Sequence, residues 1–236
     1  MPRVKRAPKE ALCGLRTPVR FIITAGPTRE YLDPVRFLSN PSTGKMGFAI
    51  AAEAARRGDE VTLIAGPVAL KTPDRVHRVD VTSAREMLKA SLEGLESLEG
   101  CGNSVFISTA AVADWRPAKC AAKKLKKGEM SGVLKLVRNP DILKTINRTI
   151  EQSNNRTIRL VGFAAETDDV LAEASRKCRE KGLSFIVAND VTKKGCGFGT
   201  DTNRVTFVFP DGTMKKFPLM TKRMVAKRIL DEVSRL

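Results

Sequence analysis

Short apolar runs alternate with longer helical patterns along this chain, and the alternation narrows the possible folds more than any other property of the sequence. Residues 21–25 read as a short buried strand that ends at a glycine. After a long loop, a helix is expected to begin at Ser42 or Thr43, either of which can cap it, and to end at Gly58. Residues 61–65 then form a second strand. A strand, a loop, a helix and a strand in this order predict the first unit of a parallel, doubly wound sheet.

The alternation continues to the end of the chain, which extends the predicted sheet. Further strands are expected at residues 79–81, 105–108, 133–137, 160–164 and 184–188, and further helices at residues 83–92, 142–150 and 170–181. A turn at residues 210–213 separates two strand-like runs and predicts a β-hairpin, and an apolar stripe after it predicts a last helix. We therefore expect an α/β fold, with a doubly wound, mostly parallel sheet and an antiparallel C-terminal hairpin extension.

Two segments interrupt this pattern and indicate how the chain is divided. Residues 1–19 are polar, basic and aperiodic, which indicates a basic flexible N-terminal arm. Residues 20–236 then form a single domain, which is long enough for a sizeable core. Inside this domain, residues 117–132 are rich in lysine, alanine and glycine, and we interpret them as a mobile lysine-rich flap.

The net charge restricts the kind of partner. With 42 lysines and arginines against 26 aspartates and glutamates, the chain carries a formal charge of +16 at pH 7. A partner with several negative charges is therefore expected, and nucleic acid, an anionic membrane surface and polyphosphate metabolites all fit. Aromatic residues make up only 5% of the chain, which argues against single-strand binding by base stacking. A solvated basic surface without a specific partner also fits this charge.

The sequence lacks the marks of a membrane or secreted protein. No run approaches the ~18 uninterrupted apolar residues of a membrane span, and the basic N-terminal residues are not followed by the apolar core of a secretory signal. The five cysteines are scattered without a CxxC pair, which argues against a disulfide framework and a zinc cluster. The one histidine, His77, is expected on a surface strand. We expect a cytoplasmic protein with reduced thiols.

Standard nucleotide-binding motifs are missing from the first strand-to-helix connection. Seventeen residues separate Gly26 from Gly44, which is too many for a G-x-G-x-x-G turn. Gly44 and Lys45 do not form a P-loop, because Met46 replaces the required serine or threonine. An NAD(P)-dependent reductase and a P-loop enzyme therefore both lose support, whereas a less common nucleotide or substrate loop remains open.

Polar residues near the predicted helix starts and strand ends are candidates for a site. Asn40 precedes the first helix, and its amide can either bind an acyl group or a developing oxyanion, or serve as a turn residue. Arg36, in the same loop, can meet an anionic substrate or stay solvated. Small residues at 110–113 let a ligand approach the backbone or pack a helix tightly, and Asp114 can bind sugar hydroxyls or cap a helix.

Two groups of lysines are candidates for phosphate contacts. Residues 123–127 carry lysines in the predicted flap, where ammonium groups can close over phosphates. The same run also fits a solvated charge cluster or a nucleic-acid patch. Lys177 and Lys181 are one turn apart on a predicted helix, so both can reach one anion, although an ordinary exposed face gives the same spacing.

Longer strings connect these candidates to one family. Over residues 20–235 the chain contains, in order, ITAGPTREYLDPVRFLSNPSTGKMGFAIAAEAARRG, VTLIAGPVAL, TAAVADWRP, KLKK, NPDIL, VGFAAET, ANDV and GFGTDTNRV. Together they resemble the phosphopantothenate–cysteine ligase family, the synthetase half of the bacterial coenzyme A flavoprotein. Because few residues precede the first strand, the flavin-binding decarboxylase half is expected to be absent. The resemblance implies a stand-alone synthetase with a Rossmann-like sheet and no flavin.

The resemblance implies a two-step ligation. The carboxylate of 4′-phosphopantothenate attacks the α-phosphate of CTP in the presence of Mg²⁺, pyrophosphate leaves, and an acyl-cytidylate forms. The amine of L-cysteine then attacks the acyl carbon, which releases CMP and gives 4′-phosphopantothenoylcysteine. A positive cleft would attract these polyanionic substrates. The expected nucleotide is CTP, and ATP, which some eukaryotic relatives use, is the alternative.

The resemblance also implies roles for individual residues. The catalytic residues would be Asn40, which holds the acyl-cytidylate, and Lys124, the flap lysine that meets the phosphates. The substrate-binding residues would be Arg36, Asn40, Ala110 and Ala111. The nucleotide-binding residues would be Ser108, Thr109, Ala110, Asp114, Lys124, Pro140, Asp141, Ile142, Leu143, Phe163, Lys177 and Lys181. The metal ligands stay unassigned, because Mg²⁺ is expected to bridge phosphate oxygens with few protein contacts.

In the family, the segment around Arg36 and Asn40 reaches into the neighbouring subunit's site. The resemblance therefore implies a homodimer with shared sites and small-molecule substrates, with neither nucleic acid nor a membrane as partner. The chain departs from the usual pattern at Trp115, where a smaller aromatic residue is common, and at Pro41 and Thr43. None of these changes removes a proposed catalytic group. The rival nucleic-acid function would need a helix-turn-helix, zinc-finger or RNP string, which the sequence lacks.

Overall fold

The computed structural model describes residues 17–98, 102–126, 128, 132–153, 157–166, 170–190, 195–197 and 199–236, without the side chains of Glu166 and Asp190. Residues 1–16 of the predicted N-terminal arm lie outside this part of the chain, so its flexibility stays a prediction. The predicted flap is described except for residues 127 and 129–131.

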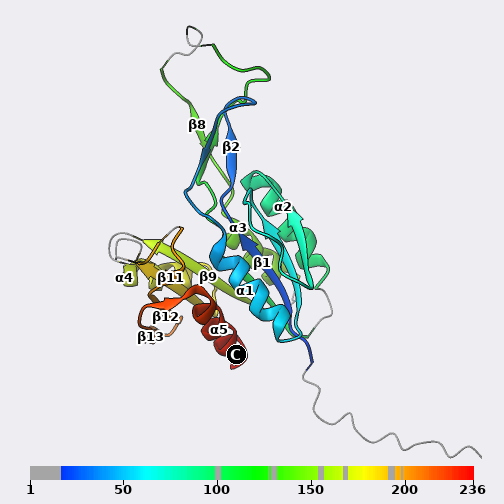
Figure 1. The fold of residues 1–236 in the computed structure, drawn as a ribbon, viewed down its shortest axis with the longest axis vertical. Helices are drawn as coiled ribbons and strands as arrows, with labels where there is room; N and C mark the ends of the chain where they lie inside the picture. The colour runs from blue at the N-terminus through cyan, green and yellow to red at the C-terminus, as the bar shows by residue number, and fades with distance from the viewer. Residues whose placement is uncertain are drawn as a thin grey trace, which may run out of the picture.

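An eight-stranded sheet forms the centre of the molecule (Figure 1), in the order β13-β12-β10-β9-β6-β1-β4-β5. Its parallel strands are β1 (Arg20–Ala25), β4 (Glu60–Ala65), β5 (Val76–Asp80), β6 (Ser104–Ser108), β9 (Ile158–Glu166) and β10 (Phe185–Asp190). The chain starts at β1, builds outward to β5, and then crosses to β6 on the other side of β1. This order is that of a doubly wound Rossmann-type sheet and confirms the predicted fold class.

Antiparallel strands extend the sheet near the C-terminus, as predicted. β12 (Val205–Val208) pairs with β10 and with β13 (Met214–Lys216), and both pairings are antiparallel. A separate two-stranded sheet joins β11 (Thr202–Asn203) to β14 (Met220–Thr221). The predicted turn therefore closes a hairpin that lies beside the last parallel strand.

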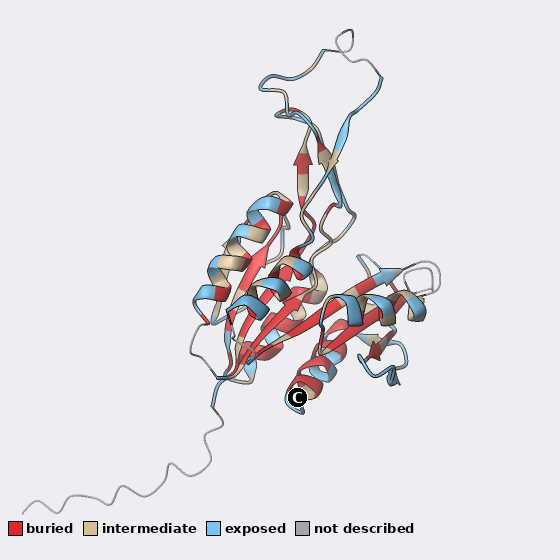
Figure 2. Cartoon of the chain, turned by 180° about the vertical axis from the view of Figure 1, so that it is seen from behind, coloured by how far each residue is buried: buried red, intermediate tan, exposed pale blue. Residues whose placement is uncertain are grey.

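Helices cover both faces of the sheet, and Figure 2 shows the buried strands between them. The described helices are α1 (Lys45–Arg56), α2 (Ala84–Glu96), α3 (Ile142–Gln152), α4 (Val170–Glu180) and α5 (Lys222–Val233). One apolar cluster joins α1 and α5 to one face, and a second joins α2, α3 and α4 to the other. In β1, Phe21 and Ile23 belong to the first cluster and Ile22 to the second. Because both faces of β1 are buried, its sequence is continuously apolar.

A two-ribbon extension projects from one end of the sheet (Figure 1). It consists of the hairpin β2 (Arg29–Tyr31) and β3 (Phe37–Ser39) and of the antiparallel pair β7 (Trp115–Pro117) and β8 (Leu136–Arg138). Strand β2 also contacts β7. The sequence predicted a loop in place of β2 and β3, and it predicted a strand over 133–137 in place of β8. The prediction failed here because three-residue strands are too short to show a reliable alternation.

Side-chain contacts stabilise the hairpin of this extension. The guanidinium carbon of Arg29 lies 4.5 Å from the ring centroid of Phe37, and the ring of Tyr31 lies 5.4 Å from the same ring. Glu30 is buried, and its Oε1 accepts a hydrogen bond of 2.8 Å from the amide of Ala84 at the start of α2. The hairpin is therefore fastened to the body of the domain by a contact between distant parts of the sequence.

The first helix begins differently from the prediction. Its N-cap is Gly44, which has a φ of 77°, and no side chain caps the helix, so the expected Ser42 or Thr43 cap is wrong. The left-handed backbone at this position favours glycine. Ser42 instead accepts a long hydrogen bond of 3.4 Å from the amide of Gly44 through its hydroxyl.

Three smaller expectations concern single residues and segments. His77 lies exposed on β5, as predicted. Cys120, Cys178 and Cys196 are free thiols, burial raises the pKa of Cys178 to about 11, and the other two cysteines lie outside the described residues. No helix in the described part of the chain is long and apolar enough to cross a membrane.

Candidate active site

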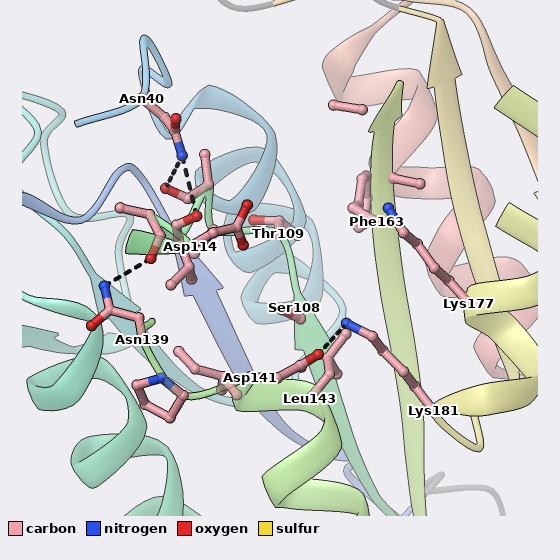
Figure 3. A pocket seen from close by; sticks show the side chains of 18 of the residues that line it. Asn40, Ser108, Thr109, Asp114, Asn139, Asp141, Leu143, Phe163, Lys177 and Lys181 are labelled. Atoms are coloured by element: carbon pink, nitrogen blue, oxygen red, sulfur yellow. Dashed lines mark hydrogen bonds and ion pairs between the residues drawn. The ribbon is translucent and has the colours of Figure 1, made fainter. Parts of the chain in front are cut away.

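A cavity of about 720 Å³ lies at the carboxyl ends of β6 and β9 (Figure 3). Its walls come from the residue after β3, the connection between β6 and β7, the start of α3, the second half of β9 and one face of α4. Ligands of doubly wound sheets bind at this edge, where the strand order reverses. The position of the cavity is therefore the one that the fold favours for a ligand.

The cavity gathers predicted site residues from distant parts of the sequence. Its lining includes Asn40, Ser108, Thr109, Ala110, Ala111, Asp114, Pro140, Asp141, Ile142, Leu143, Phe163, Lys177 and Lys181. Two predicted residues, Arg36 and Lys124, are not in this lining. The structure thus brings together all the candidates except those on the two-ribbon extension.

Hydrogen bonds between neighbouring segments fix the wall of the cavity that follows β6. The Thr109 hydroxyl donates to the Thr24 carbonyl over 2.6 Å, and the Ala111 amide donates to the Gly26 carbonyl over 2.9 Å. The small side chains at 110 and 111 leave the adjacent backbone lining the cavity. This wall is therefore held by hydrogen bonds and has small side chains, which fits the alternative in which a ligand approaches the backbone.

Asn40 is held against this wall by its side-chain amide. Its Nδ2 donates to the carbonyls of Ala111 over 3.1 Å and Val112 over 3.2 Å (Figure 3). Because these bonds use both N–H donors of the amide, the oxygen Oδ1 is the group that Asn40 can offer to a ligand. The predicted donation to an oxyanion would require these bonds to break.

The start of α3 lines the cavity through Asp141, Ile142 and Leu143. Asp141 caps the helix by accepting from the Lys144 amide over 3.1 Å, and its Oδ2 lies 2.8 Å from Lys181 Nζ. Burial alone would raise the pKa of Asp141, but the hydrogen bonds from Lys181 and from the Lys144 amide lower it overall. A helix N-terminus with a paired cation beside it is suited to phosphate oxygens.

Lys177 and Lys181 reach the cavity from α4. Figure 3 shows the side chain of Lys181 extended toward Asp141 at the start of α3 and that of Lys177 extended toward Phe163 on β9. Their ammonium groups and the α3 N-terminus form the positive side of the cavity. The exposed carboxylate of Asp114 lies on the opposite wall, and within the described residues it has no hydrogen-bond or ion-pair partner.

The cavity rim contains residues to which the sequence assigned no role. Trp115 and Arg138 line it and face each other across β7 and β8, with the guanidinium carbon 5.2 Å from the indole centroid. Asn139 follows β8 and binds the segment around β7. Its Nδ2 donates to the Ala113 carbonyl over 2.8 Å, and its Oδ1 accepts from Arg116 over 3.1 Å. The string NPDIL contains Asn139, but only the structure shows that this side chain is used within the wall.

A second, smaller cavity of about 80 Å³ lies beside the first, next to the start of α1. The two share Thr109, Phe163, Ala164 and Ala165 in their linings. Asn189 lines the second cavity, and among the described side chains its buried Oδ1 is a polar atom without a hydrogen-bond partner. No role was predicted for Asn189, because a buried asparagine has no local signature beyond its place in the string ANDV.

The described residues do not form a preformed metal site. Within them, no group of three or more histidine, cysteine, aspartate or glutamate side chains is placed to hold a metal ion. The carboxylates that line the larger cavity belong to Asp114 and Asp141. Two carboxylates suit Mg²⁺ that keeps several waters and binds mainly to phosphate oxygens.

The fold and this cavity define a class: an α/β protein with a doubly wound sheet and a cavity whose lysines and helix N-terminus suit an anionic ligand. Residues 17–236 match the family described as "DNA/pantothenate metabolism flavoprotein C-terminal domain". The chain belongs to this family.

Curated relatives of the chain carry one name. The coenzyme A biosynthesis bifunctional protein CoaBC of Vibrio vulnificus is 44% identical over 218 residues, which cover 92% of this chain and 52% of the relative. The protein of that name from Escherichia coli is 45% identical over 218 residues, covering 91% of this chain and 51% of the relative. The chain thus spans about half the length of the curated relatives it matches.

Solved structures share the fold. A crystal structure of the C-terminal domain of CoaBC aligns with a TM-score of 0.74 and 42% identity, covering 91% of this chain and 93% of that chain. The DNA/pantothenate metabolism flavoprotein from Streptococcus pneumoniae aligns with a TM-score of 0.71 and 25% identity, and the alignment covers 92% of this chain and 99% of that chain. A Cab2 variant in complex with phosphopantothenate-cysteine aligns with a TM-score of 0.73 and 17% identity, and the alignment covers 92% of this chain and 87% of that chain. This likeness concerns the fold alone.

Proposed function

We propose that this chain is a phosphopantothenate–cysteine ligase of coenzyme A biosynthesis that uses CTP. The observation that carries the proposal is the convergence of Asn40, Asp114, Lys177 and Lys181 in one cavity beside the start of α3. Family membership and the 42% identity to the C-terminal domain of CoaBC support the same function. A ligase that consumes CTP and a phosphorylated metabolite would work in the cytoplasm, where such metabolites are made.

The proposed reaction has two steps, the first at the α-phosphorus of CTP and the second at the carboxyl carbon of 4′-phosphopantothenate. A carboxylate oxygen of 4′-phosphopantothenate attacks the α-phosphorus of CTP, and the bond to pyrophosphate breaks. The nitrogen of L-cysteine then attacks the acyl carbon and loses a proton, and CMP leaves with the electrons of the acyl–oxygen bond. The first step concentrates negative charge at the phosphates, and the second places it on the acyl oxygen.

The positive side of the cavity fits the first step. Lys177, Lys181 and the amides at the start of α3 can hold phosphate oxygens, because they combine two ammonium groups with a helix N-terminus. The pairing of Lys181 with Asp141 orients one ammonium group before a ligand arrives. The carboxylate of Asp114 can accept hydrogen bonds from the ribose hydroxyls.

Asn40 fits the second step as an acceptor. Its Nδ2 is bound to the wall carbonyls of Ala111 and Val112, which fixes the side chain and leaves Oδ1 for the ligand. An attacking amine carries N–H groups, and Oδ1 can accept one of them and orient the nitrogen toward the acyl carbon. This role extends the predicted one, in which the asparagine holds the acyl-cytidylate.

Mg²⁺ would bind to this cavity chiefly through the phosphates of the nucleotide. Asp114 and Asp141 are the described carboxylates that could add a protein contact. When bound, the ion would offset negative charge on the phosphate oxygens. The residues of the chain would then need only to position the nucleotide and to keep Lys181 near the same oxygens.

We also propose a homodimer in which each cavity is completed by the second copy. Arg36 and Lys124 have predicted ligand roles, yet both lie on the two-ribbon extension and not in the lining of their own chain's cavity. Val35, Phe37 and Leu136, on the same extension, are exposed apolar side chains, as expected for a surface that a second copy covers. In this arrangement the extension of one copy carries Arg36 to the cavity of the other.

The experiment that tests the function is pyrophosphate release by the purified chain. The assay contains Mg²⁺, 4′-phosphopantothenate and L-cysteine, with CTP, ATP, GTP or UTP in parallel reactions. Release that requires phosphopantothenate and is fastest with CTP supports the ligase and its nucleotide. Faster release with ATP overturns the choice of CTP, and no release with any nucleotide overturns the ligase.

A further inference from the structure

A buried carboxylate in the turn between β2 and β3 has a role that the cavity does not explain. Asp33 is fully buried, and its Oδ1 accepts from the amides of Val35 and Arg36, each over 2.9 Å. Its Oδ2 accepts from Arg36 Nε over 3.0 Å and also from Nη2. The hydrogen bond from the Arg36 guanidinium is the largest of the effects that hold the pKa of Asp33 well below its ordinary value.

Asp33 and Arg36 also bind the lysine-rich segment, which is the predicted flap at residues 117–132 and is distant from them in the sequence. Asp33 Oδ2 accepts from the Leu125 amide over 3.2 Å, and Arg36 Nη2 donates to the Leu125 carbonyl over 2.9 Å. Both backbone polar groups of Leu125 are therefore bound by one carboxylate and one guanidinium. A further bond of 2.8 Å joins the Ala121 amide to the Leu32 carbonyl. The segment is thus fixed to the hairpin at two points.

A hairpin turn by itself does not need such a pair. Asp211, in the turn between β12 and β13, is exposed and accepts from the amide and hydroxyl of Thr213, within its own turn. Asp33 uses one oxygen in this local way and its other oxygen for Arg36 and Leu125. The second oxygen therefore serves the contact between the hairpin and the lysine-rich segment.

We infer that Asp33 and Arg36 are positioning residues that anchor the lysine-rich segment, so that Arg36 and Lys124 are presented to the phosphorylated ligand as one unit. The inference rests on the proposed ligase function for the nature of that ligand. Lys124 is the direct neighbour of Leu125, whose peptide groups are fixed on both sides. The anchor removes backbone freedom at Leu125, in the middle of the predicted flap, while the side chains of Lys123, Lys124 and Lys126 stay exposed.

The anchor is tested first by hydrogen exchange in the full chain without ligand. Asp33→Asn keeps the size of the side chain but removes the charge that holds Arg36 and Leu125. We expect peptides that span residues 121–126 to exchange at least about tenfold faster, because the Leu125 amide loses its charged acceptor and the segment loses one of its two attachments. Arg36→Lys should give the same local change, since a lysine cannot bridge Asp33 and the Leu125 carbonyl as a guanidinium does.

The matched control is Glu53→Gln, which removes another buried, ion-paired carboxylate. Glu53 binds Arg56 and Arg57 at the end of α1, away from the extension. The Glu53→Gln variant should leave the hydrogen exchange of residues 121–126 unchanged. Wild-type exchange of this segment in both Asp33→Asn and Arg36→Lys would overturn the anchor. Faster exchange over the whole chain, to the same extent as in this segment, would also overturn it, because the effect would then be global stability.

A double-mutant cycle tests whether the anchor acts through Lys124. Pyrophosphate release is measured for Asp33→Asn, Lys124→Gln and the double variant. We expect each single change to lower kcat by about tenfold or more, and the double variant to be no slower than Lys124→Gln alone. Losses that multiply in the double variant would overturn the coupling. If the wild-type chain releases no pyrophosphate, the ligase proposal fails, while the exchange experiment still decides whether the anchor exists.

Discussion

Lys181 Nζ lies 2.8 Å from Asp141 Oδ2, so the end of α4 is joined to the carboxylate that caps α3. Both residues line the cavity on the side where the phosphates of the proposed substrates are expected. A bound phosphate would compete with Asp141 for the ammonium group and could also bind backbone amides at the start of α3. If the site binds phosphate as proposed, the strength of binding should therefore depend on the ammonium group of Lys181, which Asp141 already orients.

Lys181→Gln should weaken CTP binding by about 10- to 100-fold, which corresponds to about 1.5–3 kcal/mol for a hydrogen bond to a charged group. The measurement is isothermal titration calorimetry with Mg²⁺. Arg176→Gln is the matched control, because Arg176 lies on the same helix but pairs with Glu173 and Glu180 and does not line the cavity. Equal weakening in both variants would show that only the overall charge matters.

Asn40→Asp should slow the use of the acyl-cytidylate more than its formation. A carboxylate cannot donate to the carbonyls of Ala111 and Val112, and its charge opposes negative charge on the acyl oxygen. We expect product formation to fall by about 100-fold while the first turnover of pyrophosphate persists. Rapid-quench measurement of both products separates the steps. Asn147→Asp, a change on α3 outside the cavity lining, controls for charge, and wild-type turnover in Asn40→Asp would contradict the role.

Mixed dimers test whether Arg36 acts across the subunit interface. Subunits that carry Asn40→Asp and Arg36→Gln are co-expressed with different tags, and the hybrid is purified with both. If Arg36 completes the partner's cavity, one of the two sites in the hybrid is intact, and about half of the wild-type activity returns. A hybrid as inactive as the two homodimers would mean that one chain supplies both residues to a site, whether its own or its partner's, and would contradict the proposed arrangement.

Asp33 should make the stability of the chain fall in acid. Its pKa in the folded protein is below the ordinary value of 3.8, so it contributes stability that is fully present above that pH and is lost as the pH falls toward the native pKa. Asp33→Asn lacks this contribution, so its melting temperature should decline less between about pH 5 and about pH 2. Melting curves at a series of pH values check this, and parallel declines in the two proteins would contradict it.

Gly47→Ala should destabilise the domain at the cavity. A Cβ at this position would lie 2.5 Å from both Ala25 Cβ and Thr109 Oγ1, so α1 and the wall would have to separate. We expect a loss of about 1–3 kcal/mol in the free energy of unfolding, measured with denaturant. Gly102→Ala is the control, since a Cβ there meets nothing within 4 Å. A stable Gly47→Ala protein would show that the helix start can move.

Most of the sheet could be predicted from the sequence because its strands are buried on both faces. The continuous apolar run of β1 follows directly from the two apolar clusters that contain Phe21 and Ile22. The two-ribbon extension could not be predicted in this way. Its strands are short, and contacts such as that of Glu30 with the Ala84 amide join residues that are far apart in the sequence.

The candidate site also contains features that could be predicted from the sequence and features that could not. Asn40, Asp114 and the lysines of α4 lie in strings that resemble a family, so they could be named before the structure was known. Nothing in the sequence indicated that both N–H groups of Asn40 are already used, or that Arg36 is bound by Asp33 and Leu125. These facts depend on which backbone groups the fold brings near each side chain.

Trp115 gives the cavity an optical signal. It is the single tryptophan of the sequence, it is 45% exposed, and it lines the cavity rim under the guanidinium of Arg138. All indole fluorescence of the chain therefore originates at the entrance of the proposed active site. Binding of a ligand there changes the solvation of the ring, and an emission spectrum recorded during a titration reports occupancy without any label. Access of acrylamide to the same ring distinguishes an open entrance from a covered one.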